Sequence, residues 1–187
     1  MRIVLGLSLC LLVGCGGKKP GGGDFKDVEA KVAEVNAKVP DAHKADVKFK
    51  AVKLDDGRLG GLIPESWVES PNLAGFYQPA GKSVRDGDLT RYRLGSNCEG
   101  TCQDKDWASV VKNNEFDLRG TVVKDEALGD DGRLLMTENE GSVHLRLARW
   151  KKGGSRYFYC KVSLEPDARA LADAFAAACR AMTPLSW

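Results

Sequence analysis

Cysteine is the residue type through which this sequence could do chemistry. The chain has 6 cysteines and only 2 histidines among its 187 residues. Beyond the first fifteen residues, the cysteines come as Cys98 with Cys102 and Cys160 with Cys179. Such thiols form structural disulfides, exchange disulfides with substrates or bind zinc, and the redox state of the compartment helps to decide among these chemistries. The first question is therefore whether the chain is exported.

The N-terminus has the composition of a secretory signal. Arg2 gives it a positive start, and residues 3–13 are almost entirely apolar. This run is shorter than the ~20 residues that a membrane-spanning helix needs. It ends in Leu12-Val13-Gly14-Cys15, which resembles the lipobox of bacterial lipoproteins. The resemblance implies cleavage before Cys15 and lipid attachment to this cysteine. The alternative is an ordinary signal peptide whose cleavage site contains a cysteine.

The chain therefore divides into a signal peptide over 1–14, a lipidated cysteine with a tether over 15–23, and a single domain over 24–187. Glycine-rich sequence behaves as a flexible tether. The resemblance implies several acyl chains on Cys15, and two or more chains anchor a protein stably. Gly16, rather than Asp, follows the cysteine, which in enteric members of the family favours the outer membrane over the inner. The expected location is the cell envelope, with the domain facing the periplasm or the cell surface.

Charge argues against nucleic acid as a partner. Cleavage of residues 1–14 removes Arg2 and no acidic residue, so the 28 basic and 26 acidic residues of the whole chain become 27 and 26. A net charge of about +1, with both signs interspersed, lacks the basic patch that a nucleic-acid-binding protein needs. The membrane, reached through the N-terminal lipid, and an envelope protein are the expected partners.

Export makes disulfides the first expectation for the remaining four cysteines. They allow three pairings, and we favour Cys160–Cys179, because about 13 Å of strand follows Cys160 and about 20 Å of helix precedes Cys179, which brings the two to comparable heights. Cys98–Cys102 would then close a small loop. The alternative is thiol–disulfide chemistry at Cys98 and Cys102, although their spacing is not that of Cys-x-x-Cys oxidoreductases. A four-cysteine zinc site is disfavoured, because the second pair is widely spaced.

Catalytic signatures are missing from the sequence. His43 lies in a connection and His144 in a strand, and neither has a recognisable serine, cysteine or carboxylate partner. Asp55-Asp56 and similar acidic pairs adjoin glycines, which indicates turns rather than calcium or acid–base sites. No Walker, Rossmann, haem or HExxH motif is present. We therefore assign no catalytic residue, no metal ligand and no cofactor.

Hydrophobic periodicity predicts the elements that position these residues. Apolar residues recur at helical spacing first, then at alternate positions, and at helical spacing again near the C-terminus. In the strand over 142–150, Val143, Leu145 and Leu147 share one face, and His144, Arg146, Ala148 and Trp150 share the other. Strands and helices are segregated, so we expect an α+β fold with helices packed on an antiparallel sheet. The predicted elements are a helix over 24–39, strands near 47–51, 59–63, 75–77 and 89–94, a helix over 104–113, strands over 118–123, 133–137, 142–150 and 156–164, and a helix over 166–182.

The layout resembles the PsbP/Mog1-like fold. In that family an early hairpin leads into a Pro-x-x-Trp step, which is similar to Pro64-Glu65-Ser66-Trp67 here, and a terminal helix follows the last strands. The resemblance covers residues 47–182. It implies a fold and carries no functional residue over to this chain, because fold does not determine function.

The sequence thus favours a membrane-anchored envelope lipoprotein that serves as a non-catalytic binding or interaction module. Two alternatives stay open: a thiol–disulfide protein that uses Cys98 and Cys102, and an enzyme whose site is assembled from scattered residues. Trp67 and Trp107 are expected in the core, whereas Trp150 and Trp187 are expected at a contact surface.

Overall fold

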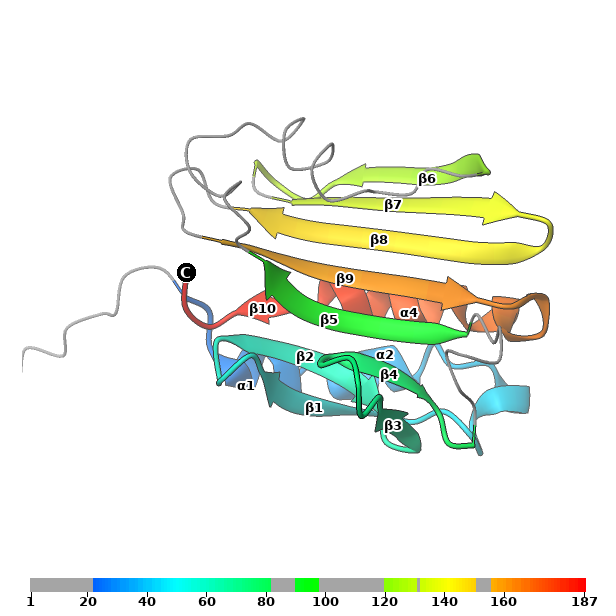
Figure 1. Cartoon of the computed structure of the whole chain (residues 1–187), viewed down its shortest axis with the longest axis horizontal. Coiled ribbons are helices and arrows are strands. Elements are labelled where there is room, and N and C mark those ends of the chain that lie inside the picture. Colours follow the sequence, from blue (N-terminus) through cyan, green and yellow to red (C-terminus); the bar gives the residue numbers. More distant parts are fainter. Residues whose placement is uncertain (1–21, 82–89, 98–119, 131, 151–155) are drawn as a thin grey trace, which may run out of the picture.

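A computed structural model describes residues 22–81, 90–97, 120–130, 132–150 and 156–187 (Figure 1). Seven of its strands form one sheet, here called the large sheet, in the order β3-β4-β5-β9-β8-β7-β6. Every recorded pair of neighbours in it is antiparallel. The strands in that order are β3 (Trp67–Glu69), β4 (Phe76–Pro79), β5 (Arg91–Asn97), β9 (Tyr157–Leu164), β8 (Ser142–Trp150), β7 (Gly132–Asn139) and β6 (Thr121–Ala127).

The described residues also form a small sheet and several helices. The small sheet has the order β1-β2-β10, and all its pairs are antiparallel. Its strands are β1 (Phe49–Leu54), β2 (Leu59–Pro64) and β10 (Thr183–Pro184). The helices are α1 (Phe25–Glu29), α2 (Val32–Asn36) and α4 (Ala172–Arg180), with 3-10 turns at η1 (Asp41–His43) and η3 (Pro166–Leu171). The predicted α+β class, an antiparallel sheet with helices packed on it, is confirmed.

The helical predictions need two corrections. The stretch predicted as one helix over 24–39 is two short helices, because the backbone makes a turn at Ala30–Lys31 between α1 and α2. Its apolar stripe is nevertheless buried at Val28, Val35 and Val39. The stretch predicted as a helix over 166–182 begins as η3 and becomes α-helical only from Ala172. Pro166 starts η3 as expected, since proline fits the first turn of a helix.

Helix α4 fills the space between the two sheets. It lies against β8 and β9 of the large sheet on one side and against α2 and β2 on the other, and it is visible behind β9 and β5 in Figure 1. Phe175, fully buried, is its central side chain, with the rings of Phe49, Trp67 and Tyr92 each 5.2 Å from its own ring centre. Aromatic groups in such tilted and edge-on contacts add to the stabilisation that burial provides.

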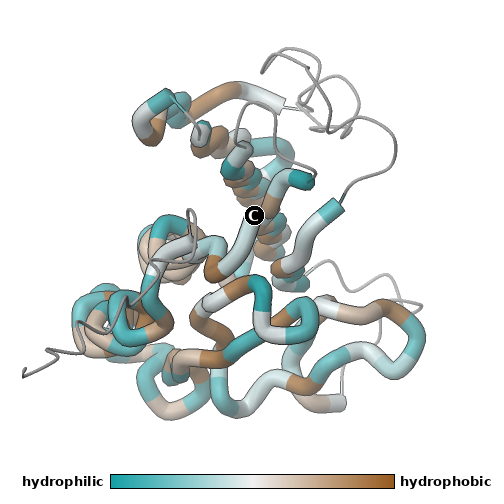
Figure 2. The backbone as a smooth tube through the Cα atoms, turned by 90° about the vertical axis from the view of Figure 1, so that its left-hand side faces the viewer, coloured by the Kyte–Doolittle hydropathy of each residue, from teal (hydrophilic) through white to brown (hydrophobic). Residues whose placement is uncertain are grey.

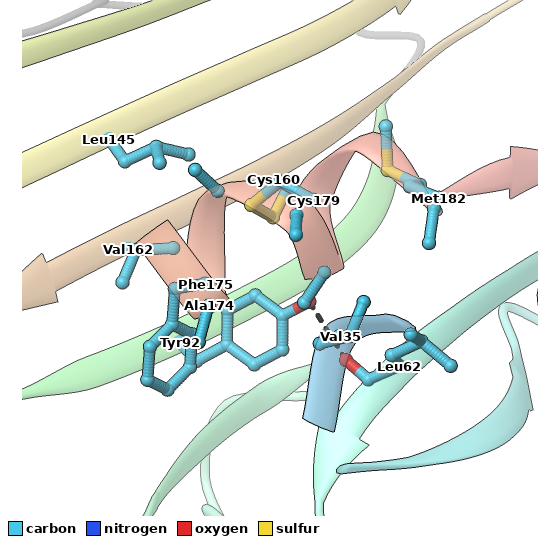
Figure 3. Close-up of a cluster of buried hydrophobic side chains, with 14 of the residues drawn as sticks. Val35, Leu62, Tyr92, Leu145, Cys160, Val162, Ala174, Phe175, Cys179 and Met182 are labelled. Atoms are coloured by element: carbon cyan, nitrogen blue, oxygen red, sulfur yellow. Dashed lines mark hydrogen bonds between the residues drawn. A yellow bond between two sulfur atoms is a disulfide. The ribbon is translucent and has the colours of Figure 1, made fainter. Parts of the chain in front are cut away.

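Tyr92 connects the two sheets through the core (Figure 3). Its ring is fully buried, and its hydroxyl donates a 2.8 Å hydrogen bond to the carbonyl oxygen of Leu62 in β2. Burial raises the pKa of Tyr92 far above its ordinary value, so the phenol stays protonated and keeps donating. The polar end of this large side chain therefore has its partner inside the core.

The Cys160–Cys179 disulfide joins β9 to α4 in the same core (Figure 3). The predicted pairing of these two cysteines is thus confirmed, and both residues are fully buried. A core position means that the crosslink also holds the helix on the inner face of the large sheet. Cys15, Cys98 and Cys102 lie outside the described residues, so lipidation and the second disulfide stay predictions.

Strand β2 is buried on both faces, which explains its glycines. A methyl group on Gly60 would lie 2.8 Å from Val28 Cγ2, and one on Gly61 would lie 2.8 Å from Leu94 Cδ1. The two glycines therefore let α1 and the large sheet approach β2 from opposite sides. The predicted hairpin around Asp55 and Asp56 is confirmed, and both residues have a φ of 52°, a left-handed conformation that Asp tolerates in turns.

Candidate functional site

The two faces of the large sheet differ in composition. The inner face, toward α4, carries the fully buried Leu145, Leu147 and Cys160, and alternation places His144, Arg146 and Tyr159 on the other, outer face. The predicted division of residues 142–150 between two faces is confirmed. One related prediction is wrong: Trp150, expected at the surface, is only 8% exposed and packs in a second cluster with Tyr157 and Tyr159 on the outer face.

Three cationic side chains lie in one row across the outer face. Lys161 in β9 is directly opposite Arg93 in β5 on one side and directly opposite Arg146 in β8 on the other. We call Arg93, Lys161 and Arg146 the basic row. Like charges directly opposite each other on neighbouring strands destabilise a sheet, so a row of three needs a local compensation or a functional reason.

Aromatic rings stabilise two members of the basic row. The guanidinium carbon of Arg93 lies 4.5 Å from the ring centre of Phe76 and 5.1 Å from that of Tyr159. The amino group of Lys161 lies 5.3 Å from the same Tyr159 ring. Cation–π contacts of this kind contribute about 0.5–1 kcal/mol at exposed positions and more when desolvated. The rings thus hold both cations on the outer face.

Gly95 makes room for the ring that holds Arg93. It lies directly opposite Tyr159, and a methyl group placed on it would be 2.8 Å from the Tyr159 hydroxyl oxygen and 3.1 Å from Cζ. The Tyr159 side chain therefore lies over Gly95, beside Arg93. We call Phe76, Arg93, Gly95 and Tyr159 the arginine cradle. A guanidinium that contacts aromatic rings keeps N–H donors at its edge, which suit planar, bidentate acceptors such as carboxylates.

The third member of the basic row is held by backbone oxygens. Arg146 Nη1 donates 2.8 Å hydrogen bonds to the carbonyl oxygens of Leu145 and Val162. These acceptors fix the side chain across the β8–β9 ladder. Arg93, Lys161 and Arg146 are all half-buried, which strengthens their interaction with an anion relative to fully exposed groups.

Buried polar atoms without a partner also gather on the outer face. Among the described residues, three buried side-chain atoms have no hydrogen-bond partner: Arg93 Nε, Thr137 Oγ1 and Trp150 Nε1. Register places all three side chains on the outer face, since Arg93 opposes Lys161, Thr137 opposes His144 and Trp150 opposes Tyr157. A buried unpaired polar atom costs free energy, and such atoms tend to mark sites where something else supplies a partner.

His144 contacts the hydroxyl of Ser163, a pair that the sequence pattern does not predict. Its Nδ1 lies 3.2 Å from Ser163 Oγ, because the two residues are opposite each other on β8 and β9. A serine beside a histidine is the start of a nucleophilic site. Ser163 is only 7% exposed, however, so a substrate has little access to its hydroxyl. The contact is therefore assigned to the packing of the outer face.

The other predicted positions fall away from the outer face. His43 lies in η1. Asp55 accepts a 2.6 Å hydrogen bond from the Ser96 hydroxyl, and its carboxylate lies 3.4 Å from Arg156 Nη1. It therefore connects the β1–β2 turn to the large sheet. Trp67 packs on Phe175 as predicted, and Trp107 lies outside the described residues. Within the described ranges, no three His, Cys, Asp or Glu side chains are grouped so that they could hold a metal ion.

The basic row follows from the register between neighbouring strands, which the sequence alone does not reveal. Each member stands in a stretch of alternating residues, as in Arg91-x-Arg93, His144-x-Arg146 and Tyr157-x-Tyr159-x-Lys161. Alternation alone says that these side chains share a face of their own strand. Only the order β5-β9-β8 and its registers bring them into one row.

Comparison with known proteins finds likeness in the fold only. No protein-family model and no curated protein matches the sequence. Among solved structures, the Saccharomyces cerevisiae Ran-binding protein Mog1p matches 75% of this chain and 97% of its own, at 12% identity and a TM-score of 0.46. A PsbP protein (CyanoP) from Synechocystis sp. PCC 6803 matches 72% of this chain and 91% of its own, at 10% identity and a TM-score of 0.47. These are the two kinds of protein that the PsbP/Mog1-like resemblance names, and likeness at this level says nothing about activity or partners.

Proposed function

We propose that this protein is a lipid-anchored lipoprotein of the bacterial cell envelope that works as a non-catalytic binding module. Two sequence features support the anchor: the lipobox-like residues that end at Cys15, and the glycine-rich stretch that follows. No helix in the described part of the chain is long and apolar enough to cross a membrane. Lipid on Cys15 would hold the domain at a membrane, with the outer membrane favoured and the domain facing the periplasm or the cell surface.

The partner we propose is a carboxylate-bearing segment of another envelope protein, bound on the outer face of the large sheet. The single observation that carries this proposal is the arginine cradle, in which the guanidinium carbon of Arg93 lies 4.5 Å from the ring centre of Phe76 and 5.1 Å from that of Tyr159. An arginine fixed in this way loses little side-chain entropy when a carboxylate binds, and it presents paired donors to it. Lys161 beside it adds a second positive charge on the same ring.

Fluorescence anisotropy with a labelled poly-glutamate peptide tests the binding surface. We expect saturable binding to the lipidated protein in detergent micelles, weakened tenfold or more by Arg93→Gln, since a hydrogen bond to a charged group contributes about 1.5–3 kcal/mol. Arg169→Gln is the matched control, because Arg169 pairs with Glu138 at 2.7 Å and lies on η3, away from the cradle. Equal affinities of the wild type and Arg93→Gln would exclude the cradle as the binding site.

Fractionation tests the anchor separately. The wild-type chain should incorporate labelled palmitate and sediment with membranes, whereas Cys15→Ser should do neither. A Cys15→Ser chain that still carries the lipid label would show that the lipid is elsewhere. Since this assay does not involve Arg93, its result and that of the peptide titration stand independently.

A further inference from the structure

The point where the tether joins the domain has a defined place in the fold. Gly23 N donates a 2.8 Å hydrogen bond to the carbonyl oxygen of Pro184, at the end of β10. A methyl group on Gly22 would lie 2.0 Å from the carbonyl oxygen of Leu185, and one on Gly23 would lie 2.3 Å from Thr183 Cγ2. Residues 22–23 therefore run against the C-terminal segment so closely that only glycine fits. We call Gly22 and Gly23 the tether root.

The tether root and the C-terminus share one end of the molecule. Figure 1 shows the start of the described chain beside the C-terminus, at the end where α1 begins and β10 lies. Figure 2 looks onto this end, with the C-terminus facing the viewer. The segment after β10 is fixed there, because the backbone N–H groups of Leu185 and Ser186 both donate to the carbonyl oxygen of Arg58, at 2.7 and 3.3 Å.

Trp187 stands next to the tether root. Its ring packs edge-on against Phe158, with 5.4 Å between ring centres, and the side chain stays partly exposed. Together with Gly23, Arg149, Met182, Thr183 and Pro184, it lines a shallow, open pocket. An indole with an apolar body and a donor at its edge, close to an arginine, has the chemistry of side chains that settle at the headgroup level of a bilayer.

Chain length limits how far this end can be from the anchor. Seven residue steps separate Cys15 from Gly22, and at about 3.3–3.6 Å per residue they span at most about 25 Å. A domain of this size has a radius of gyration of about 15 Å, which corresponds to a width of about 40 Å. The tether is thus too short for the domain to turn its opposite end to the bilayer.

We infer that the end of the domain formed by the tether root, the C-terminal segment and Trp187 faces the membrane, and that Trp187 contacts the lipid headgroup region. This inference rests on the proposed lipidation of Cys15. The large sheet then extends away from the bilayer from this end. The occupant of the end surface is the membrane that carries the anchor.

Tryptophan quenching in vesicles tests the inference. The lipidated full chain is reconstituted in phosphatidylcholine–phosphatidylglycerol vesicles, with or without phosphatidylcholine brominated near the top of its acyl chains. We expect bromolipid to quench the wild-type fluorescence, and Trp187→Phe to lose at least half of that quenching. Trp67→Phe is the matched control, because Trp67 packs on Phe175 in the core, and it should keep the quenching. Equal quenching in the wild type and Trp187→Phe would overturn the inference.

Vesicle flotation and a second variant distinguish the possible outcomes of this test. Flotation of the vesicles separates the two proposals: a wild-type chain that fails to float overturns the anchor and the orientation together, whereas a floating chain without Trp187-dependent quenching overturns the orientation alone. Gly22→Ala keeps Trp187 but places a methyl group against Leu185, so it should release the tether root and reduce the quenching. Unchanged quenching in this variant would contradict the role given to the tether root.

Discussion

The inner and outer faces of the large sheet are formed by the same strands but carry different kinds of side chain. On β9, Cys160 and Val162 point inward and are at most 1% exposed, whereas the alternate residues Tyr159 and Lys161 belong to the arginine cradle and the basic row. The inner face holds apolar groups and a crosslink, which stabilise the fold. The outer face holds like charges in register, which cost stability. Under the proposed function the outer face is the binding surface, so variants of the inner face should lose stability and variants of the outer face should lose binding.

The largest effect on stability should come from the inner face at Phe175. Phe175→Ala removes the ring on which Phe49, Trp67 and Tyr92 converge, and truncation of a buried phenylalanine costs about 3–5 kcal/mol. Urea unfolding followed by circular dichroism measures the change. A loss below 1 kcal/mol would show that the three-way aromatic contact does not hold α4 to the sheets.

The disulfide should come next. Replacing both Cys160 and Cys179 by alanine removes a crosslink that closes a loop with a sequence separation of 19, and the chain-entropy relation gives a loss of about 3 kcal/mol. The same variant tests the other cysteines: thiol titration of its unfolded, unreduced chain should find no free thiol if Cys98 and Cys102 are paired. Two reactive thiols would restore the thiol–disulfide alternative.

Gly95→Ala should change the shape of the outer face without changing its charge. The added methyl group meets the Tyr159 ring and pushes it off Arg93 without changing any charge. We expect a modest stability loss of about 1 kcal/mol, at the low end for overpacking because the displaced group is the end of a side chain, together with weaker binding of the poly-glutamate peptide. Gly81→Ala in an open turn is the control for an added methyl group, although its φ of 81° adds strain of its own. Unchanged affinity in Gly95→Ala would separate the cradle from binding.

The smallest effect should be the acid sensitivity of the edge strand β6. The Arg133 guanidinium lowers the pKa of Asp125, and Arg180 lowers that of Glu126, each through hydrogen bonds that join β6 to β7 or α4. A carboxyl whose folded pKa is depressed contributes stability above its unfolded pKa, about 3.9 for Asp and 4.3 for Glu, and this contribution is lost as pH falls through the folded pKa. The urea midpoint of the wild type should therefore drop on acidification below about pH 4, and the drop should be smaller in Asp125→Asn/Glu126→Gln. The exposed Asp167→Asn is the control, and equal pH slopes in all three would contradict the assignment.

Much of the inner face could be predicted from the sequence. Alternating Val143, Leu145 and Leu147 predicted the buried side of β8, and export together with element lengths predicted the Cys160–Cys179 pair, because both depend on local periodicity and spacing. Strands β3 and β10, with 3 and 2 residues, were missed, since so short a run has no readable period. The basic row was missed because register between β5, β9 and β8 is a long-range property. Trp150 was misplaced at the surface for the same reason.

Measuring binding and stability on the same variant most directly tests the proposed division between a stabilising inner face and a binding outer face. Arg93→Gln/Lys161→Gln removes two charges of the basic row and leaves the inner face untouched. Peptide titration and urea unfolding on the same samples should show an affinity at least tenfold weaker and an unfolding free energy within about 1 kcal/mol of the wild type, because exposed and half-exposed charges contribute little to stability. An unchanged affinity combined with a large loss of stability would contradict the account, since the basic row would then belong to the architecture of the sheet.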